Sequence, residues 1–145
     1  MPIGLFKQAL QSGQRQIKKV QGKDALEGIV CGALYLAAEG GIDNKEADQL
    51  NVSLANCKPL ESFSGSDISP VVAKFREMVE QGPRMAARQF KIEVEEAVNK
   101  DPSLGEVIVS IALDVADQGG LSDSEIQRAK TLCQWCRVSP SDFDL

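Results

Sequence analysis

The chain has 145 residues, a formal net charge of −5 and no histidine, which excludes Ser–His and Cys–His nucleophilic catalysis. Its length suits one domain with its own hydrophobic core, so we expect residues 1–145 to form a single domain. The ordinary fractions of apolar and charged residues argue against disorder.

The charge is unevenly distributed along the chain. Residues 1–23 carry five basic residues and no acid, so the remainder sums to −10. Because an acidic body repels phosphates, we expect no nucleic-acid partner. The first ten residues lack the pattern of a signal peptide, and four cysteines in that context indicate a reducing compartment. We therefore expect a cytoplasmic protein with free thiols.

Residues 2–20 carry apolar side chains at helical spacing, with the basic residues between them. The pattern predicts a helix, weakened at Ser12-Gly13. Two interpretations stay open: a helix packed on the domain, or peripheral attachment of residues 1–23 to an anionic membrane surface.

A unit of 34 residues occurs twice, as Asp24–Cys57 and Ser103–Cys136, and a constant offset aligns the copies without a gap. Each copy has an apolar run, a Gly-Gly pair and a more polar stretch, which predicts helix, turn and helix. The apolar runs are hydrophobic nearly all round, as in central helices, and are too short to span a bilayer. Capping boxes are expected at four helix starts: Asp24/Glu27, Asp43/Glu46, Ser103/Glu106 and Ser122/Glu125.

Two more helices are expected between the units. Residues 58–67 read as a turn-rich connector, and Ser69-Pro70 as the N-cap and first residue of a helix that ends at Gly82. The next helix is expected over 84–100. We therefore expect an all-α, single-domain bundle of about seven helices, with two helical hairpins related by a pseudo-twofold axis. The segment 63–68 after the first unit resembles 138–143 after the second.

Acidic residues gather around the two Gly-Gly turns. Turns expose carbonyl oxygens, and hard cations favour clustered carboxylates and carbonyls. Solvated capping acids are the simpler interpretation, and the calcium-loop spacing is absent. Asp114 interrupts the second apolar run where Tyr35 stands in the first, so we expect it to face a groove or a polar partner. The candidate ligands for a divalent cation are Glu39, Asp43, Glu46, Asp114, Asp117, Asp123 and Glu125.

Cys133 and Cys136 form a CxxC pair late in a predicted helix. Their stripe predicts that both thiols point into the core, while a redox or soft-metal role is the alternative. Trp135 lies off that stripe, so it is expected either to anchor a partner or to cover the edge of the core. Asp114, Asp117 and Trp135 are the candidate partner-binding residues.

The ordered set of these features resembles the tellurite-resistance TerB family and TerB-like domains. The resemblance rests on Ala9–Gly13, on both turns with Glu46 and Glu125, and on Val138–Phe143. It implies an all-helical cytoplasmic protein of a stress-response system, associated with a TerC-like integral membrane protein and with TerD-like calcium-binding proteins. The family's turns usually read Asp-Gly, whereas this chain has Gly40 and Gly119 in place of the aspartates. Glu39 and Asp117 lie close enough to substitute in part.

The expected function is therefore that of a non-enzymatic interaction module at the inner face of the membrane. Its acidic face, built from the two turns, would dock a basic partner or a divalent cation. The alternative is direct handling of metal or oxyanion by the acidic turns or by the thiols of Cys133 and Cys136.

Overall fold

A computed structural model describes residues 20–38, 41–116 and 120–145. Over those ranges the protein has six α-helices, two short 3₁₀ helices and no strand, which confirms the all-α class. The helix expected within residues 2–20 lies almost wholly outside the described residues. The α-helices are α2 (Lys23–Ala37), α3 (Asn44–Ala55), α4 (Gly65–Gln81), α5 (Pro83–Lys100), α6 (Leu104–Ala116) and α7 (Asp123–Cys136); the 3₁₀ helices are η1 (Lys58–Leu60) and η2 (Pro140–Phe143).

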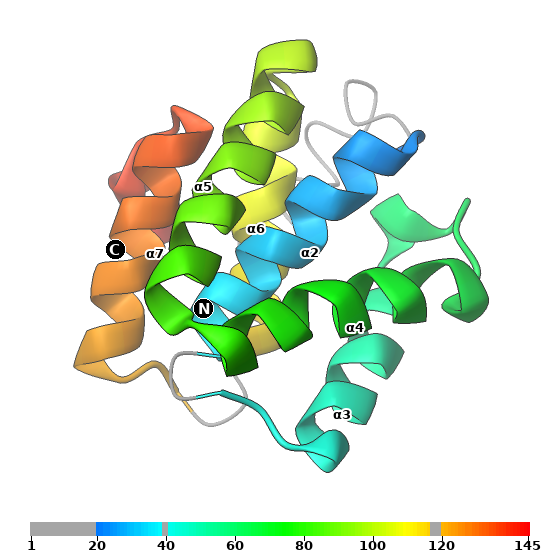
Figure 1. Ribbon diagram of the computed structural model, residues 1–145. Helices are drawn as coiled ribbons and strands as arrows, with labels where there is room; N and C mark the ends of the chain where they lie inside the picture. Colours follow the sequence, from blue (N-terminus) through cyan, green and yellow to red (C-terminus); the bar gives the residue numbers. More distant parts are fainter. Residues whose placement is uncertain (1–19, 39–40, 117–119) are drawn as a thin grey trace.

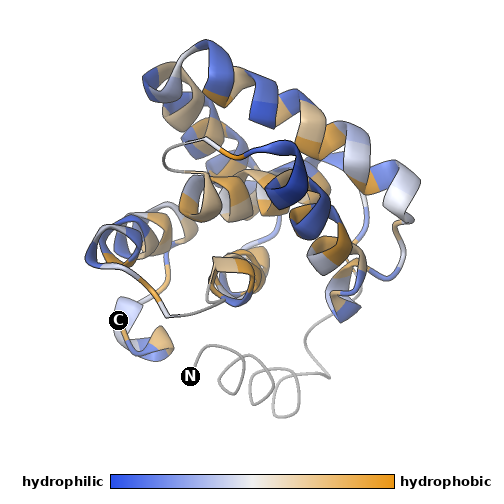
Figure 2. Cartoon of the chain, turned by 90° about the horizontal axis from the view of Figure 1, so that it is seen from below, coloured by the Kyte–Doolittle hydropathy of each residue, from blue (hydrophilic) through white to orange (hydrophobic). Residues whose placement is uncertain are grey.

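The apolar helices α2 and α6 form the centre of the molecule, as their composition predicts. They lie side by side, with α5 and α7 on one flank and α3 and α4 on the other (Figure 1). Gly28 and Gly32 permit this packing, because an added Cβ would lie 2.7 Å from Ala97 Cβ on α5 or 2.6 Å from Ile108 Cγ2 on α6. The surrounding helices are orange on one side and blue on the other (Figure 2). Each thus presents an apolar face to the core.

The two repeat units share their helices but not their packing. In the second unit α7 runs along α6, whereas in the first α3 packs mainly on α4 and makes few contacts with α2. The helix α4 occupies that flank of α2, held by a 3.0 Å ion pair between Lys74 Nζ and Glu27 Oε2. The first hairpin is therefore the more open of the two.

The described residues at the end of each turn are alike in both units. The second glycine of each pair, Gly41 or Gly120, has a positive φ, of 86° or 92°. Each lies two residues before an N-cap, at Asp43 or Ser122, and both N-caps carry the expected capping box. Positive φ is inexpensive only for glycine, which explains this residue at both positions.

Three helix starts differ from the expectation. The capping box expected at Ser103/Glu106 is wrong: the Ser103 hydroxyl donates to Asp101 at 2.6 Å, and no hydrogen bond joins Ser103 to Glu106, both of which the structure describes.

The capping box predicted at Asp24/Glu27 is also absent, because Gly22 is the N-cap of α2. Asp24 instead forms an ion pair with Lys100, and the buried Glu27 forms one with Lys74. The start at Ser69-Pro70 is also wrong.

The helix α4 begins five residues earlier than expected, at Gly65, because Ser64 and Asp67 form a capping box there. Pro70 is thus inside the helix. The missing N–H of Pro70 costs one helical hydrogen bond, and α4 nevertheless continues through Pro70 to Gln81.

Candidate functional site: a groove lined by Glu46 and Glu125

An acidic groove of about 230 Å³ is lined by residues of α3, by the carboxyl ends of α2 and α6, and by the first turn of α7. Glu46 of α3 and Glu125 of α7, equivalent residues of the two repeat units, both line it. Lys and Arg are absent from the lining, all of which belongs to the described residues. The other lining residues are Ala37, Ile42, Gln49, Leu50, Ser53, Val115 and Ala116.

The capping boxes fix both carboxylates. Glu46 Oε1 accepts a 3.1 Å hydrogen bond from the N–H of Asp43, and Glu125 Oε1 accepts one of 2.9 Å from the N–H of Ser122. Each reciprocal bond also holds, from the N–H of Glu46 to Asp43 at 2.8 Å and from the N–H of Glu125 to Ser122 at 3.1 Å. The boxes occupy one oxygen of each Glu and limit its rotamers, so the acidic groove carries two positioned negative charges.

Apolar residues form the floor of the acidic groove. Ile42 and Leu50 are buried, and Val115 is half-buried at the end of α6. Two arginines hold the backbone nearby: Arg76 Nε donates to the carbonyl of Ile42 at 3.2 Å, and Arg128 Nε to that of Tyr35 at 2.6 Å. The positive charge of Arg128, at the carboxyl end of α2, also complements the dipole of that helix.

The other acids named from the sequence are distributed differently. Asp43 and Asp123 are exposed at the starts of α3 and α7 but do not line the acidic groove. Asp114 is half-buried, and its charge contributes to a raised pKa at Cys57, so its side chain lies on the Cys57 side of α6. Glu39 and Asp117 lie outside the described residues. Within the described part of the chain, no three His, Cys, Asp or Glu side chains are close enough to hold a metal ion together.

Trp135 covers the edge of the core. It is 9% exposed, and its ring centroid lies 4.4 Å from that of Tyr35, whose other contact is the guanidinium of Arg128, 4.0 Å from the ring. This stack joins α7 to α2. The repeat does not single out Arg128, because the equivalent residue in the first unit is the uncharged Gln49.

The thiols are directed into the core. Cys133 and Cys136 are buried, and burial raises the pKa of Cys133 to about 11 and that of Cys136 further. Burial, followed by the charge of Asp114, raises the pKa of Cys57 to about 11. Because the thiolate is the nucleophile and the metal ligand, these environments disfavour both roles at neutral pH.

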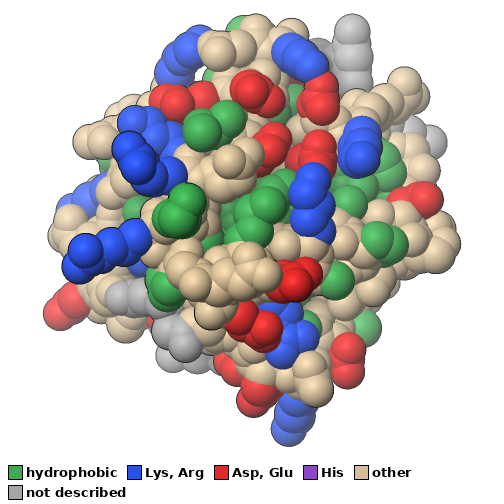
Figure 3. Space-filling model, viewed as in Figure 1, with side chains coloured by type: hydrophobic (Ala, Val, Ile, Leu, Met, Phe, Trp, Pro, Cys, Tyr) green, Lys and Arg blue, Asp and Glu red, His purple; other side chains and the backbone are tan. Residues whose placement is uncertain are grey.

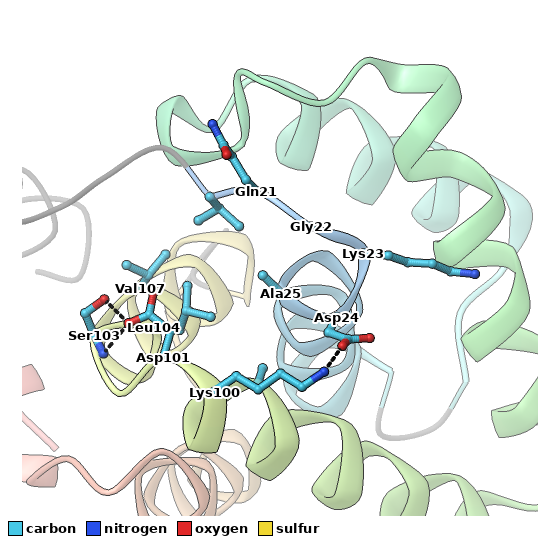
Figure 4. A pocket seen from close by; sticks show the side chains of 12 residues that line it. Gln21, Gly22, Lys23, Asp24, Ala25, Lys100, Asp101, Ser103, Leu104 and Val107 are labelled. Carbon is cyan, nitrogen blue, oxygen red and sulfur yellow. Dashed lines mark hydrogen bonds and ion pairs between the residues drawn. The ribbon is translucent and has the colours of Figure 1, made fainter.

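A second pocket, of about 400 Å³, lies between the amino ends of α2 and α6 (Figure 4). Asp24 pairs with Lys100 beside it, and the Ser103 hydroxyl donates to Asp101 at 2.6 Å. The hydrogen bond and charge of Lys100 hold the pKa of Asp24 below its usual value. Four polar side chains of this pocket thus form two pairs, and its apolar lining includes Ala25, Leu104 and Val107.

Comparison of the chain with protein-family models, curated proteins and solved structures gave no significant match. The resemblance to TerB-like domains therefore stays a prediction from the sequence. In the described ranges, no helix combines the length and the apolar character needed to cross a bilayer.

Proposed function

We propose that the protein is a non-enzymatic interaction module whose acidic groove docks a basic, amphipathic protein segment. The observation that carries this proposal is the pairing of Glu46 and Glu125, fixed by their capping boxes, over an apolar floor. A segment with one apolar residue between two cationic ones would fill the floor and meet both carboxylates. The negative charge of the protein would accelerate association with such a segment. Added salt would screen these charges and lower the affinity.

The chemistry of the described residues supports binding rather than catalysis. The carboxylates of the acidic groove already serve as helix caps, and the buried thiols have raised pKa values. The resemblance to TerB-like domains supports the same kind of function: a cytoplasmic partner of a membrane-associated stress-response complex, with TerC-like and TerD-like proteins as the expected partners. A divalent cation is the competing ligand for the same carboxylates, and it is one arm of the test below.

The test uses fluorescence anisotropy with a labelled helical peptide of lysine and leucine, and a control peptide with glutamate in place of lysine. We compare the natural chain with Glu46→Gln/Glu125→Gln, which keeps the capping hydrogen bonds and removes two charges. The double variant should weaken binding of the lysine peptide about tenfold at low salt. Glu77→Gln/Glu106→Gln, which removes two exposed charges outside the groove, is the matched control and should change binding of the lysine peptide less than twofold.

Equal losses in the two double variants would contradict the proposal, as would equal binding of both peptides. A parallel calorimetric titration of chelator-stripped protein with Ca²⁺, Mg²⁺ and Zn²⁺ tests the competing ligand. Saturable binding that is lost in Glu46→Gln/Glu125→Gln, without peptide binding, would assign the acidic groove to a cation instead.

A further inference from the structure

The outer side of α5 carries a row of mostly exposed residues, in which Glu95 is half-buried and Asn99 accepts a hydrogen bond from Arg137. Met85, Arg88, Ile92, Glu95 and Asn99 follow one another at alternating intervals of three and four residues. That spacing defines one face of a helix and is the spacing of a coiled-coil contact line. We call this row the α5 seam. Its two large apolar side chains are the exposed ones of α5, Met85 at 76% and Ile92 at 46%.

The α5 seam faces away from the core. The buried residues of α5 are Ala86, Phe90, Val94, Ala97 and Val98, which pack towards α2, α4 and α7. Met85 and Ile92 lie on the opposite side of the helix at 3.6 residues per turn. In the space-filling view, apolar side chains appear over α5, with basic side chains to their left and acidic ones around its upper end (Figure 3).

Basic and acidic residues are segregated along most of α5. Arg84, Arg88 and Lys91 stand in its first half, whereas Glu93, Glu95 and Glu96 stand in its second half. Arg84 in the first turn opposes the helix dipole, whereas Lys100 in the last turn complements it. Neither Arg88 nor Glu95 has an ion-pair partner among the described residues. An external helix running antiparallel would satisfy both charges.

We propose that the α5 seam binds the α5 seam of a second copy of this chain, in an antiparallel dimer with its twofold axis at Ile92. Arg88 stands four residues before Ile92 and Glu95 three residues after it. An antiparallel copy therefore places each Arg88 beside the partner's Glu95, on both sides of an Ile92–Ile92 contact. Such an interface is isologous: one patch matches itself under a twofold rotation, so assembly closes at two copies.

A second copy fits this face better than an unrelated partner, because the α5 seam itself carries both charges of the proposed ion pairs, Arg88 and Glu95. A parallel arrangement would place Arg88 against Arg88 and Glu95 against Glu95, which repel each other. The contact line is short and its ion pairs are exposed, so the dimer is weak and forms at micromolar or higher concentrations. The acidic groove is built from α2, α3, α6 and α7 and stays open in the dimer.

Sedimentation equilibrium of the full chain, from about 10 to 500 µM at low salt, tests the proposal through charge reversal. The natural chain should show a concentration-dependent mass that approaches two copies. Arg88→Glu alone and Glu95→Arg alone should each raise the dissociation constant at least tenfold. The double reversal Arg88→Glu/Glu95→Arg should restore it to within about threefold, because the same pairs form with opposite sign.

Two controls share the charge changes of the single variants. Lys45→Glu and Asp48→Arg alter exposed residues of α3, away from the α5 seam, and should leave association unchanged. Ile92→Glu should abolish dimerisation, while circular dichroism shows an unchanged helical spectrum. A monomer at every concentration, a double reversal that does not restore association, or an association that survives Ile92→Glu would each overturn the proposal.

Discussion

Glycine at two positions determines how closely the central helices approach. At Gly28 and Gly32 the side chain is absent because the space is taken by Ala97 and Ile108. Gly65, in contrast, has no atom within 4 Å of an added Cβ, and it stands in the first turn of α4. The same residue type is thus a packing requirement in α2 and dispensable in α4.

Gly28→Ala should therefore destabilise the protein, and Gly65→Ala should not. The new methyl at position 28 would contact a methyl that cannot rotate away, at a cost of about 1–3 kcal/mol even after alanine's better helix propensity. Gly65→Ala should stabilise by roughly 0.5 kcal/mol through the unfolded chain. Urea unfolding followed by circular dichroism measures both, and two variants of equal stability would contradict this account of the packing.

Capping boxes show how far local sequence predicts an element. The pattern of a short polar residue followed three positions later by an acid predicted the starts of α3 and α7 correctly. The same pattern failed at Asp24/Glu27, because Lys100 and Lys74 take the two carboxylates, and these partners come from distant parts of the chain. Only the tertiary fold distinguishes the two cases. At Ser64 the box was overlooked because its acid is Asp67 rather than Glu.

The cap of α4 should make stability depend on pH. Hydrogen bonds from the backbone N–H and hydroxyl of Ser64 to Asp67 lower the pKa of that carboxyl below its ordinary 3.8. A lowered pKa in the folded state stabilises the protein above pH 3.8, and the stabilisation is lost as pH falls through the folded pKa. The natural chain should thus exceed Asp67→Asn in unfolding free energy at pH 7, with the gap closing at about pH 2.

Urea unfolding of both proteins across that pH range measures the gap. Asp48→Asn, an exposed acid within α3 that caps no helix, is the control and should show a smaller pH-dependent difference. A gap between the natural chain and Asp67→Asn that stays constant from pH 7 to about pH 2 would contradict the role of Asp67.

At the scale of the molecule, the repeat predicted the candidate site only in part. Its symmetry identified Glu46 and Glu125 as equivalent acids beside glycine turns, and both line one groove. It did not predict the floor of that groove or the stack of Arg128, Tyr35 and Trp135. Those features depend on the different packing of the two units: α3 packs on α4, whereas α7 packs along α6. The similarity of the two repeat sequences does not predict this difference.

The proposed docking groove and the proposed dimer interface are different surfaces, so both can be occupied at once. The acidic groove lies among α2, α3, α6 and α7, and the α5 seam is separate from it. A dimer through the α5 seam would present two acidic grooves to one partner. Bivalent engagement of this kind raises apparent affinity without any new contact in either groove.

The most direct test of the central claim is where a basic segment binds. Methyl and amide NMR spectra of the labelled chain, recorded during titration with the lysine–leucine peptide, locate the contact. We expect the largest shifts at Leu50, Val115 and Glu125 around the acidic groove, and their reversal on adding salt. Shifts confined to other faces, with those three residues unchanged, would contradict the assignment of the acidic groove as the docking site.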